Sequence, residues 1–187
     1  MPSRTLILVR HGQYHLARDH ERYGQLTPIG KRQAKHLAKR LAHYPIDTLH
    51  ASTAPRAIET ATLIGAQLRG VPQRRSALLL EGIPTALKGL SREARRSAPE
   101  HRARMERAFA RYFRPTRGKD RIEVVVFHGN ILRYLMRRAM GDSAHKWSRL
   151  EVMHCGISIV DVRGDGATRI LALNDVGHLP FSMQTFL

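Results

Sequence analysis

Short apolar runs alternate with longer amphipathic segments along this chain. Leu6-Ile7-Leu8-Val9 is the first apolar run, and Ile122-Glu123-Val124-Val125-Val126-Phe127 is the strongest. Nearly continuous runs of this length are typical of strands buried on both faces of a parallel sheet. Between them, apolar residues recur at the 3.6-residue spacing of helices. The pattern predicts an α/β fold, a three-layer α/β/α sandwich with a mostly parallel central sheet.

Turn and capping signals divide the first half of the chain. Thr27-Pro28 is an N-cap followed by proline at the first helical position. The helix that it opens places Ile29, Ala34, Leu37, Ala38 and Leu41 on one face. A strand is predicted over residues 46–50. A second helix begins near Pro55, ends before Gly70 and carries Ile58, Ala61, Thr62 and Leu68 inward.

The second half repeats the alternation. Residues 73–90 are weakly patterned and are predicted as a connection. A long helix is expected over residues 93–112, with Pro99 as a point of interruption. The strong apolar strand follows, and then a helix through Ile131, Leu135 and Met136. Gly164-Asp165-Gly166 predicts a hairpin turn between strands over 157–162 and 168–173.

Composition places the chain among globular proteins of one domain, expected to span residues 1–187. No apolar run approaches the roughly 20 residues of a membrane span, and the first strand begins almost at once, so we expect neither a signal peptide nor a membrane anchor. A single cysteine, Cys155, excludes an internal disulfide and a cysteine metal cluster. These features predict a cytoplasmic protein.

The charge is strongly positive, with 32 Lys and Arg against 15 Asp and Glu. Such a surface attracts anions, including phosphorylated proteins, nucleotides, nucleic acids and acidic membranes. We interpret the arginine series 92-95-96 and 102-104-107-111 as a solvated helix face. No RNA-binding signature or cysteine-histidine finger spacing accompanies it, so nucleic acid is the less favoured partner.

Three polar segments follow predicted strands: Arg10-His11-Gly12, Ser52 to Arg56, and His128-Gly129. Parallel strands end at the same edge of a sheet, so these segments are expected to converge. Arginine offers a planar fork for anions, and histidine a nitrogen that is nucleophilic near neutral pH. Arg10 and His11 alone fit equally well a strand-end arginine in solvent and a turn-capping histidine. The convergence favours a site for phosphate.

Five ordered motifs resemble those of the histidine phosphatase, or phosphoglycerate mutase-like, superfamily over residues 6 to about 180. They are residues 8–12, 26–34, 52–61, Glu81-Gly82 and 127–130. Residues 13–15, 79–84, 130–134 and 171–180 are most similar to its mitochondrial serine/threonine protein phosphatase branch. Leu80 departs from the arginine that is usual there.

The resemblance implies a role for each site residue. His11 is the expected nucleophile, forming a phosphohistidine, and Glu81 the general acid. Arg10, Arg56, His128 and Gly129 are expected to bind the phosphoryl group, with His128 also part of the catalytic set. Attack requires a neutral His11 whose other N–H is held by a carbonyl near Gly12, and burial of Glu81 beside Leu78–Leu80 and Ile83 would raise its pKa. No metal ion or cofactor is expected, because arginine supplies the positive charge.

The expected function is therefore a metal-independent phosphomonoester hydrolase. Its substrate would be a phosphoprotein (Ser/Thr) or a small phosphorylated metabolite. One alternative is a mutase-type phosphotransferase; Tyr14 and Ala17 stand where the mutases carry Ser or Thr and Asn. Another is a noncatalytic phosphate- or nucleic-acid-binding module, which would need neither His11 nor Glu81. Homodimers are common in the family, so a homodimer is one expected assembly.

Two further predictions concern surrounding residues. Gln13, Tyr14 and His15 either line the substrate mouth or form a surface loop. Trp147 is expected to anchor a loop, and Cys155 to pack in the core.

Overall fold

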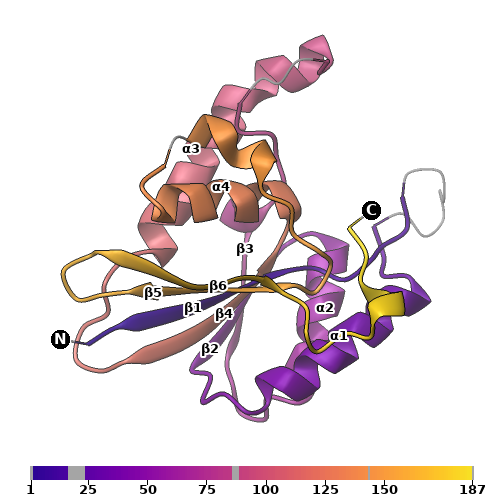
Figure 1. The fold of residues 1–187 in the computed structure, drawn as a ribbon, viewed down its shortest axis with the longest axis vertical. Coiled ribbons are helices and arrows are strands. Elements are labelled where there is room, and N and C mark those ends of the chain that lie inside the picture. Colours follow the sequence, from indigo (N-terminus) through magenta and orange to yellow (C-terminus); the bar gives the residue numbers. More distant parts are fainter. Residues whose placement is uncertain (1, 17–23, 86–88, 143, 187) are drawn as a thin grey trace.

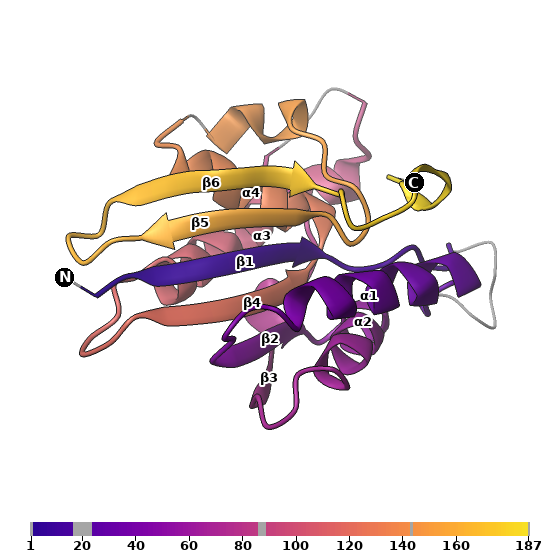
Figure 2. The ribbon, with the colours of Figure 1, turned by 60° about the horizontal axis from the view of Figure 1, so that its bottom comes forward.

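A six-stranded sheet forms the centre of the protein (Figures 1 and 2). The structure is a computed structural model that describes residues 2–16, 24–85, 89–142 and 144–186. The strands are β1 (Arg4–Arg10), β2 (Thr48–Ser52), β3 (Gln73–Ser76), β4 (Arg121–Phe127), β5 (Ile157–Val162) and β6 (Thr168–Asp175). Their order is β3-β2-β4-β1-β5-β6, and the first four are mutually parallel. Since β5 pairs antiparallel with both β1 and β6, the sheet is mostly parallel, as predicted.

Helices cover both faces of this sheet. Figures 1 and 2 show α1 (Pro28–Leu41) and α2 (Pro55–Gly65) on one face, and α3 (Arg92–Tyr112) and α4 (Gly129–Ala139) on the other. Short 3₁₀ turns occur at η2 (Ala77–Leu79), η3 (Ala144–Arg149) and η4 (Phe181–Met183). Thr27 caps α1 as predicted, its Oγ1 accepting from the amide of Gly30 at 3.0 Å. The three-layer α/β/α architecture is confirmed.

The central strands are apolar throughout because they serve two cores. In β1, Leu6 and Leu8 pack into the core under α3 and α4, and Ile7 and Val9 into the core over α1 and α2. All four side chains are at most 1% exposed. Burying each contributes on the order of 1.5–3 kcal/mol, and alternation in a strand sends successive residues to opposite faces.

Elements beside the second strand differ from the sequence-based expectation. β2 begins and ends two residues later than predicted, and its last residue is Ser52. α2 ends at Gly65 instead of continuing toward Gly70, and Leu68 is buried from the turn that follows. Thr62 is exposed, contrary to its predicted inward position, and its hydroxyl bonds the carbonyl of Ile58 at 2.9 Å.

Two predictions were wrong, one about the segment before α3 and one about α3 itself. The stretch 73–90 contains β3, a polar edge strand that pairs with β2 and carries no hydrophobic signal. α3 continues through Pro99 without interruption. Proline costs a helix one hydrogen bond, and α3 contains it while burying Ala98 beside it and Met105 two turns later.

Candidate active site

The predicted residues meet at one edge of the sheet. β2, β4 and β1 are neighbours, and their carboxyl ends lie side by side. Arg10 ends β1, Arg56 is the second residue of α2, and His128 links β4 to α4. The C-terminus returns to this same edge (Figure 2). The topology thus gathers two arginines and two histidines from three separate loops.

His11 is buried, with 2% of its surface exposed, and its proton position is fixed by its neighbours. Nδ1 lies 2.8 Å from the carbonyl oxygen of Gly12, which can only accept, so Nδ1 carries the hydrogen. Nε2 accepts from the Nε–H of Arg56 at 3.0 Å. Burial, followed by the charges of His128 and Arg56, holds the pKa of His11 well below its usual value. The imidazole is neutral, with its lone pair on Nε2.

The segment at residues 26–34 packs against the loop that carries His11. The amide of Gln13 donates to Oε1 of Gln33 at 2.8 Å, and the amide of Gly12 donates to Thr60 at 3.1 Å. A Cβ added to Gly12 would lie 2.7 Å from the carbonyl oxygen of Gly30. This close backbone approach explains the glycines, and it fixes the loop from which His11 projects.

Arg56 is oriented by an aromatic neighbour. Its guanidinium lies 4.6 Å from the ring centroid of Tyr14, within range of a cation–π interaction. The Tyr14 ring is also edge-on to His11, at 5.1 Å between centroids. Tyr14 therefore lies in the site rather than in a detached surface loop, whereas Gln13 holds the loop through its bond to Thr27.

His128 is fully buried beside the nucleophile candidate, with ring centroids 5.1 Å apart. Its Nε2 forms a 2.9 Å hydrogen bond with Oγ of Ser52, and its buried Nδ1 has no partner among the residues that the structure describes. Burial, followed by the charge of Arg56, lowers the pKa of His128 to about 2, so the ring is neutral. A buried polar nitrogen without a partner is costly, and a bound phosphoryl group would satisfy it.

Arg10 is held by two main-chain carbonyls. Its Nη1 donates to Val152 at 2.7 Å and to Phe186 at 2.9 Å. Its Nε is buried and has no partner within the described ranges of the chain. Gly129, the first residue of α4, faces this guanidinium so closely that a Cβ there would lie 3.4 Å from Nε. Nη1 of Arg10 is thus held by the main chain, whereas its Nε–H remains for an anion.

Glu81 reaches the same site from the loop after η2. Its carboxylate oxygens accept from the amides of Gly82 at 3.1 Å, Ile131 at 3.3 Å and Asn130 at 3.4 Å. These donors and the charge of Arg56 lower the pKa, but burial outweighs them and raises it above its usual value. The expected direction of the shift is confirmed, and a raised pKa is what a general acid requires.

Arg104 shows that the arginine series on α3 is not simply a solvated face. Its guanidinium donates to the carbonyl of Glu81 at 2.7 Å and to that of Leu80. Nearby, His101 Nδ1 accepts from the amide of Ile83 at 3.2 Å. The inner side of α3 therefore holds the Glu81 loop in place, which corrects the interpretation for this part of the series.

His154 is a site residue that the sequence analysis missed. It is 1% exposed, and its ring lies 5.7 Å from that of His11. Nδ1 lies 3.0 Å from the carbonyl oxygen of Thr185, and the buried Nε2 finds no partner in the part of the chain that the structure describes. Burial, followed by the charge of Arg10, lowers the pKa of His154 to about 3. No motif pointed to it, because its place depends on the return of the C-terminal segment.

The remaining predictions concern packing and absences. Trp147 is buried and donates to Oγ1 of Thr85 at 2.9 Å, as expected of a loop anchor, and Cys155 is buried. Ala17 lies outside the described residues. Among the residues that the structure describes, no three His, Cys, Asp or Glu are grouped to hold a metal ion. No helix in the described ranges is long and apolar enough to cross a membrane.

Together these groups form an anion site built around a neutral imidazole. Nε2 of His11 accepts from Arg56, and the rings of His128 and His154 lie 5.1 and 5.7 Å from the His11 ring. The Arg10 guanidinium lies against Gly129 at the start of α4. A carboxyl group with a raised pKa lies beside them. Such an arrangement can hold a phosphoryl group, attack it with nitrogen and deliver a proton to its leaving group.

The fold is that of a phosphoglycerate mutase-like α/β/α sandwich, and its site presents a buried, neutral histidine beside two arginines. The family model of the histidine phosphatase superfamily (branch 1) matches residues 6–101 and 86–176. The chain belongs to that superfamily, as its motifs indicated.

Curated relatives carry a more specific name. The chain is 36% identical over 186 residues to the mitochondrial serine/threonine-protein phosphatase Pgam5 of Caenorhabditis briggsae, covering 95% of this chain and 65% of the relative. It is 35% identical over 193 residues to the protein of the same name in Caenorhabditis elegans, covering 98% and 67%. The chain thus spans about two thirds of the length of these relatives.

Solved structures share the fold at lower identity. A phosphoglycerate mutase from Plasmodium falciparum matches with a TM-score of 0.68 and 24% identity, covering 97% of this chain and 96% of that one. A putative alpha-ribazole-5'-P phosphatase from Escherichia coli matches with a TM-score of 0.72 and 21% identity, covering 91% and 96%. Both likenesses concern the fold alone.

Proposed function

We propose that the protein is a metal-independent phosphomonoester hydrolase that acts through a phosphohistidine. The observation that carries this proposal is the neutral His11, whose Nε2 lone pair accepts from Arg56 and whose ring lies 5.1 Å from that of His128 and 5.7 Å from that of His154. The names of the curated relatives support the same reaction class. They also favour a Ser/Thr phosphoprotein as substrate over a small phosphorylated metabolite.

In the first step, Nε2 of His11 attacks phosphorus and the bond to the ester oxygen breaks. Glu81, protonated, gives its proton to the departing alkoxide. Arg10, Arg56, His128 and the amide of Gly129 hold the phosphoryl oxygens, where positioned donors stabilise the spreading negative charge. The products of this step are the free alcohol and a phosphorylated His11.

In the second step, water attacks the phosphorus and the P–N bond breaks. The Glu81 carboxylate takes the proton of the water, which restores the acid form. Inorganic phosphate leaves and His11 regains its lone pair. The net reaction is hydrolysis of the ester, and no metal or redox partner enters it.

Hydrolysis of p-nitrophenyl phosphate in the presence of a chelator tests this proposal. We expect turnover by the wild type, none above background by His11→Ala, and wild-type turnover by His43→Ala, an exposed histidine in the turn after α1. Acid-labile, base-stable phosphate trapped on the wild type would identify the intermediate. Full turnover by His11→Ala would contradict the mechanism.

Substrate class needs a second comparison. A panel of phosphoserine and phosphothreonine peptides, measured beside small sugar and glycerate phosphates, would rank the two classes by kcat/KM. A higher kcat/KM for the metabolites would overturn the preference for phosphoproteins.

Location and assembly remain predictions. The cytoplasmic location expected from the sequence is not supported by relatives whose names include mitochondrial. Imaging of the full chain fused to a fluorescent protein would decide it, and light scattering would test the expected homodimer.

A further inference from the structure

A second basic cavity lies at the opposite edge of the sheet from His11. It has a volume of about 280 Å³ and is bordered by the amino ends of β1 and β4, by β2 and β3, and by the segment after α3. Arg4, which lines it, begins the strand that Arg10 ends. Six residue steps of about 3.3 Å separate the two, so the cavity is about 20 Å from the catalytic edge.

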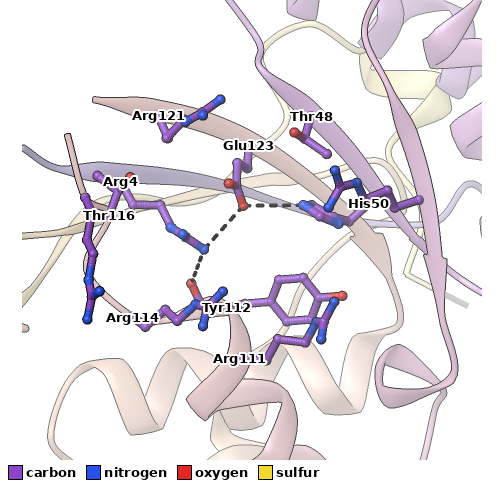
Figure 3. A pocket seen from close by; sticks show the side chains of 11 residues that line it. Arg4, Thr48, His50, Arg111, Tyr112, Arg114, Thr116, Arg121 and Glu123 are labelled. Carbon is purple, nitrogen blue, oxygen red and sulfur yellow. Dashed lines mark hydrogen bonds and ion pairs between the residues drawn. The ribbon is translucent and has the colours of Figure 1, made fainter. Parts of the chain in front are cut away.

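Arginine dominates the lining of this cavity (Figure 3). Six arginines and one carboxylate, that of Glu123, line it; the arginines are Arg4, Arg74, Arg111, Arg114, Arg117 and Arg121. In the part of the chain that the structure describes, Arg74, Arg114 and Arg117 make no hydrogen bond or ion pair. Their side chains are exposed and free to turn toward a ligand.

The floor of the cavity is fixed by a chain of polar contacts (Figure 3). Nη1 of Arg4 lies 3.5 Å from the Glu123 carboxylate and donates to the carbonyl of Tyr112 at 3.4 Å. Nε2 of His50 lies 3.3 Å from the same carboxylate. The Arg4 side chain is only 12% exposed, yet its buried Nε has no partner among the described residues. An arginine whose role is only to keep a surface soluble would extend into solvent. Arg4 instead is buried and keeps its Nε–H donor unused.

The lining also indicates what kind of molecule would fit. The groups that line the cavity are guanidinium nitrogens, the hydroxyls of Thr48 and Thr116, His50 and the Glu123 carboxylate, which already pairs with Arg4 and His50. The ring of Tyr112 is buried and offers no stacking face. A ligand with a large apolar part would find nothing to contact. Guanidinium forks match phosphate oxygens, and several forks around a compact cavity match several linked phosphates.

From this geometry we propose that the cavity binds an oligophosphate, either free or as the phosphate end of a nucleoside polyphosphate. The site goes beyond the phosphatase reaction and does not depend on it. A nucleic-acid strand is a poorer match, because strand-binding surfaces are extended grooves with exposed aromatic rings. No exposed aromatic ring is among the residues that line this cavity.

Calorimetric titration with tripolyphosphate at physiological salt tests the proposal. The double variant Arg114→Glu/Arg117→Glu removes two exposed, unpartnered guanidinium groups, so its fold should be intact. We expect one binding event to weaken about tenfold or more, since a lost charge-assisted hydrogen bond costs about this much. Turnover of p-nitrophenyl phosphate should be unchanged. Arg56→Ala separates any binding at the catalytic edge from binding here.

The matched control is Arg92→Glu/Arg96→Glu, which makes the same change in charge on exposed turns at the start of α3. Equal weakening by the two double variants would reduce the effect to net charge and overturn the proposal, as would a wild type that binds no tripolyphosphate. If Arg114→Glu/Arg117→Glu lost oligonucleotide binding but kept tripolyphosphate binding, the cavity would serve nucleic acid instead, and the proposal would be overturned. A parallel titration with metal-free ATP identifies the source: comparable affinity indicates nucleotide ends, and much weaker affinity indicates free oligophosphate.

Discussion

Nε of Arg56 donates a hydrogen bond to Nε2 of His11 across 3.0 Å. This contact, with the bond from Nδ1 to Gly12, determines which nitrogen of His11 carries the lone pair. It also places the positive charge of Arg56 next to the position that a phosphoryl oxygen would take during attack. When phosphate enters, the Arg56 fork can exchange the imidazole for an oxygen without leaving its place over Tyr14.

Loss of the Arg56 guanidinium should therefore impair transition-state binding. We expect Arg56→Ala to lower kcat/KM for p-nitrophenyl phosphate by about 10²–10³, the usual cost of losing a positioned oxyanion donor. Arg56→Lys should recover part of the loss, because it restores charge without the planar fork. Arg32→Ala, an exposed arginine on α1, serves as the control. Activity of Arg56→Ala within twofold of the wild type would exclude this role.

Glu81 should control the alkaline side of the pH profile. Its pKa is raised by burial, and its acid form is needed to protonate the leaving group, so activity should fall as pH rises through that pKa. His11 must be neutral, and its lowered pKa keeps it so; no loss is expected as pH falls through 6.5.

Glu81→Gln cannot ionise, so the alkaline fall should disappear in kcat/KM measured across pH. Phenyl phosphate, with the poorer leaving group, should lose about 10²–10⁴ in rate, and p-nitrophenyl phosphate much less. An equal loss on both substrates would show that Glu81 does not protonate the leaving group.

Most of the catalytic edge was predictable because its residues follow hydrophobic strands. Arg10 and His128 end or follow apolar runs whose parallel pairing puts them side by side, and Arg56 begins a helix after the strand between. Glu81 was found only through motif resemblance, since no periodic pattern surrounds it. Its burial depends on α4 amides and on Arg104, which are distant in sequence.

The sequence patterns did not reveal the edge strand β3 or the long-range contacts between polar side chains. β3 has no hydrophobic alternation, because an exposed edge strand needs none. His154 acquires its place from Thr185, and Arg4 from Glu123, through long-range contacts that leave no local signature. The arginine series on α3 looked uniform, but its members face the Glu81 loop, solvent or the second cavity.

The contact between Gly30 and the His11 loop should limit both stability and activity. A Cβ at Gly30 would lie 2.0 Å from the carbonyl oxygen of Gln13, a backbone atom that cannot move without shifting His11. We expect Gly30→Ala to lower the free energy of unfolding by about 1–3 kcal/mol, the range for overpacking, and to lower kcat. Urea denaturation and steady-state kinetics measure the two effects.

Gly65→Ala is the matched control for Gly30→Ala. The Cβ there would meet only the end of the exposed Gln73 side chain, which can turn away. Alanine is also favoured over glycine in a helix, so little or no destabilisation is expected. Similar effects of the two substitutions would contradict the importance of the close approach at Gly30.

The C-terminal segment should be part of the active site. The carbonyl of Phe186 accepts from Arg10, and the carbonyl of Thr185 holds both the amide and Nδ1 of His154. A chain ending at Met183 loses these contacts, which leaves Arg10 without one of its two anchors. Because small displacements of positioning groups cost up to about 10²-fold, we expect kcat/KM for p-nitrophenyl phosphate to fall by tenfold or more while the unfolding transition changes little. Phe186→Ala keeps the carbonyl and should retain activity near that of the wild type. If truncation instead raised kcat/KM, the segment would be obstructing the site rather than orienting Arg10.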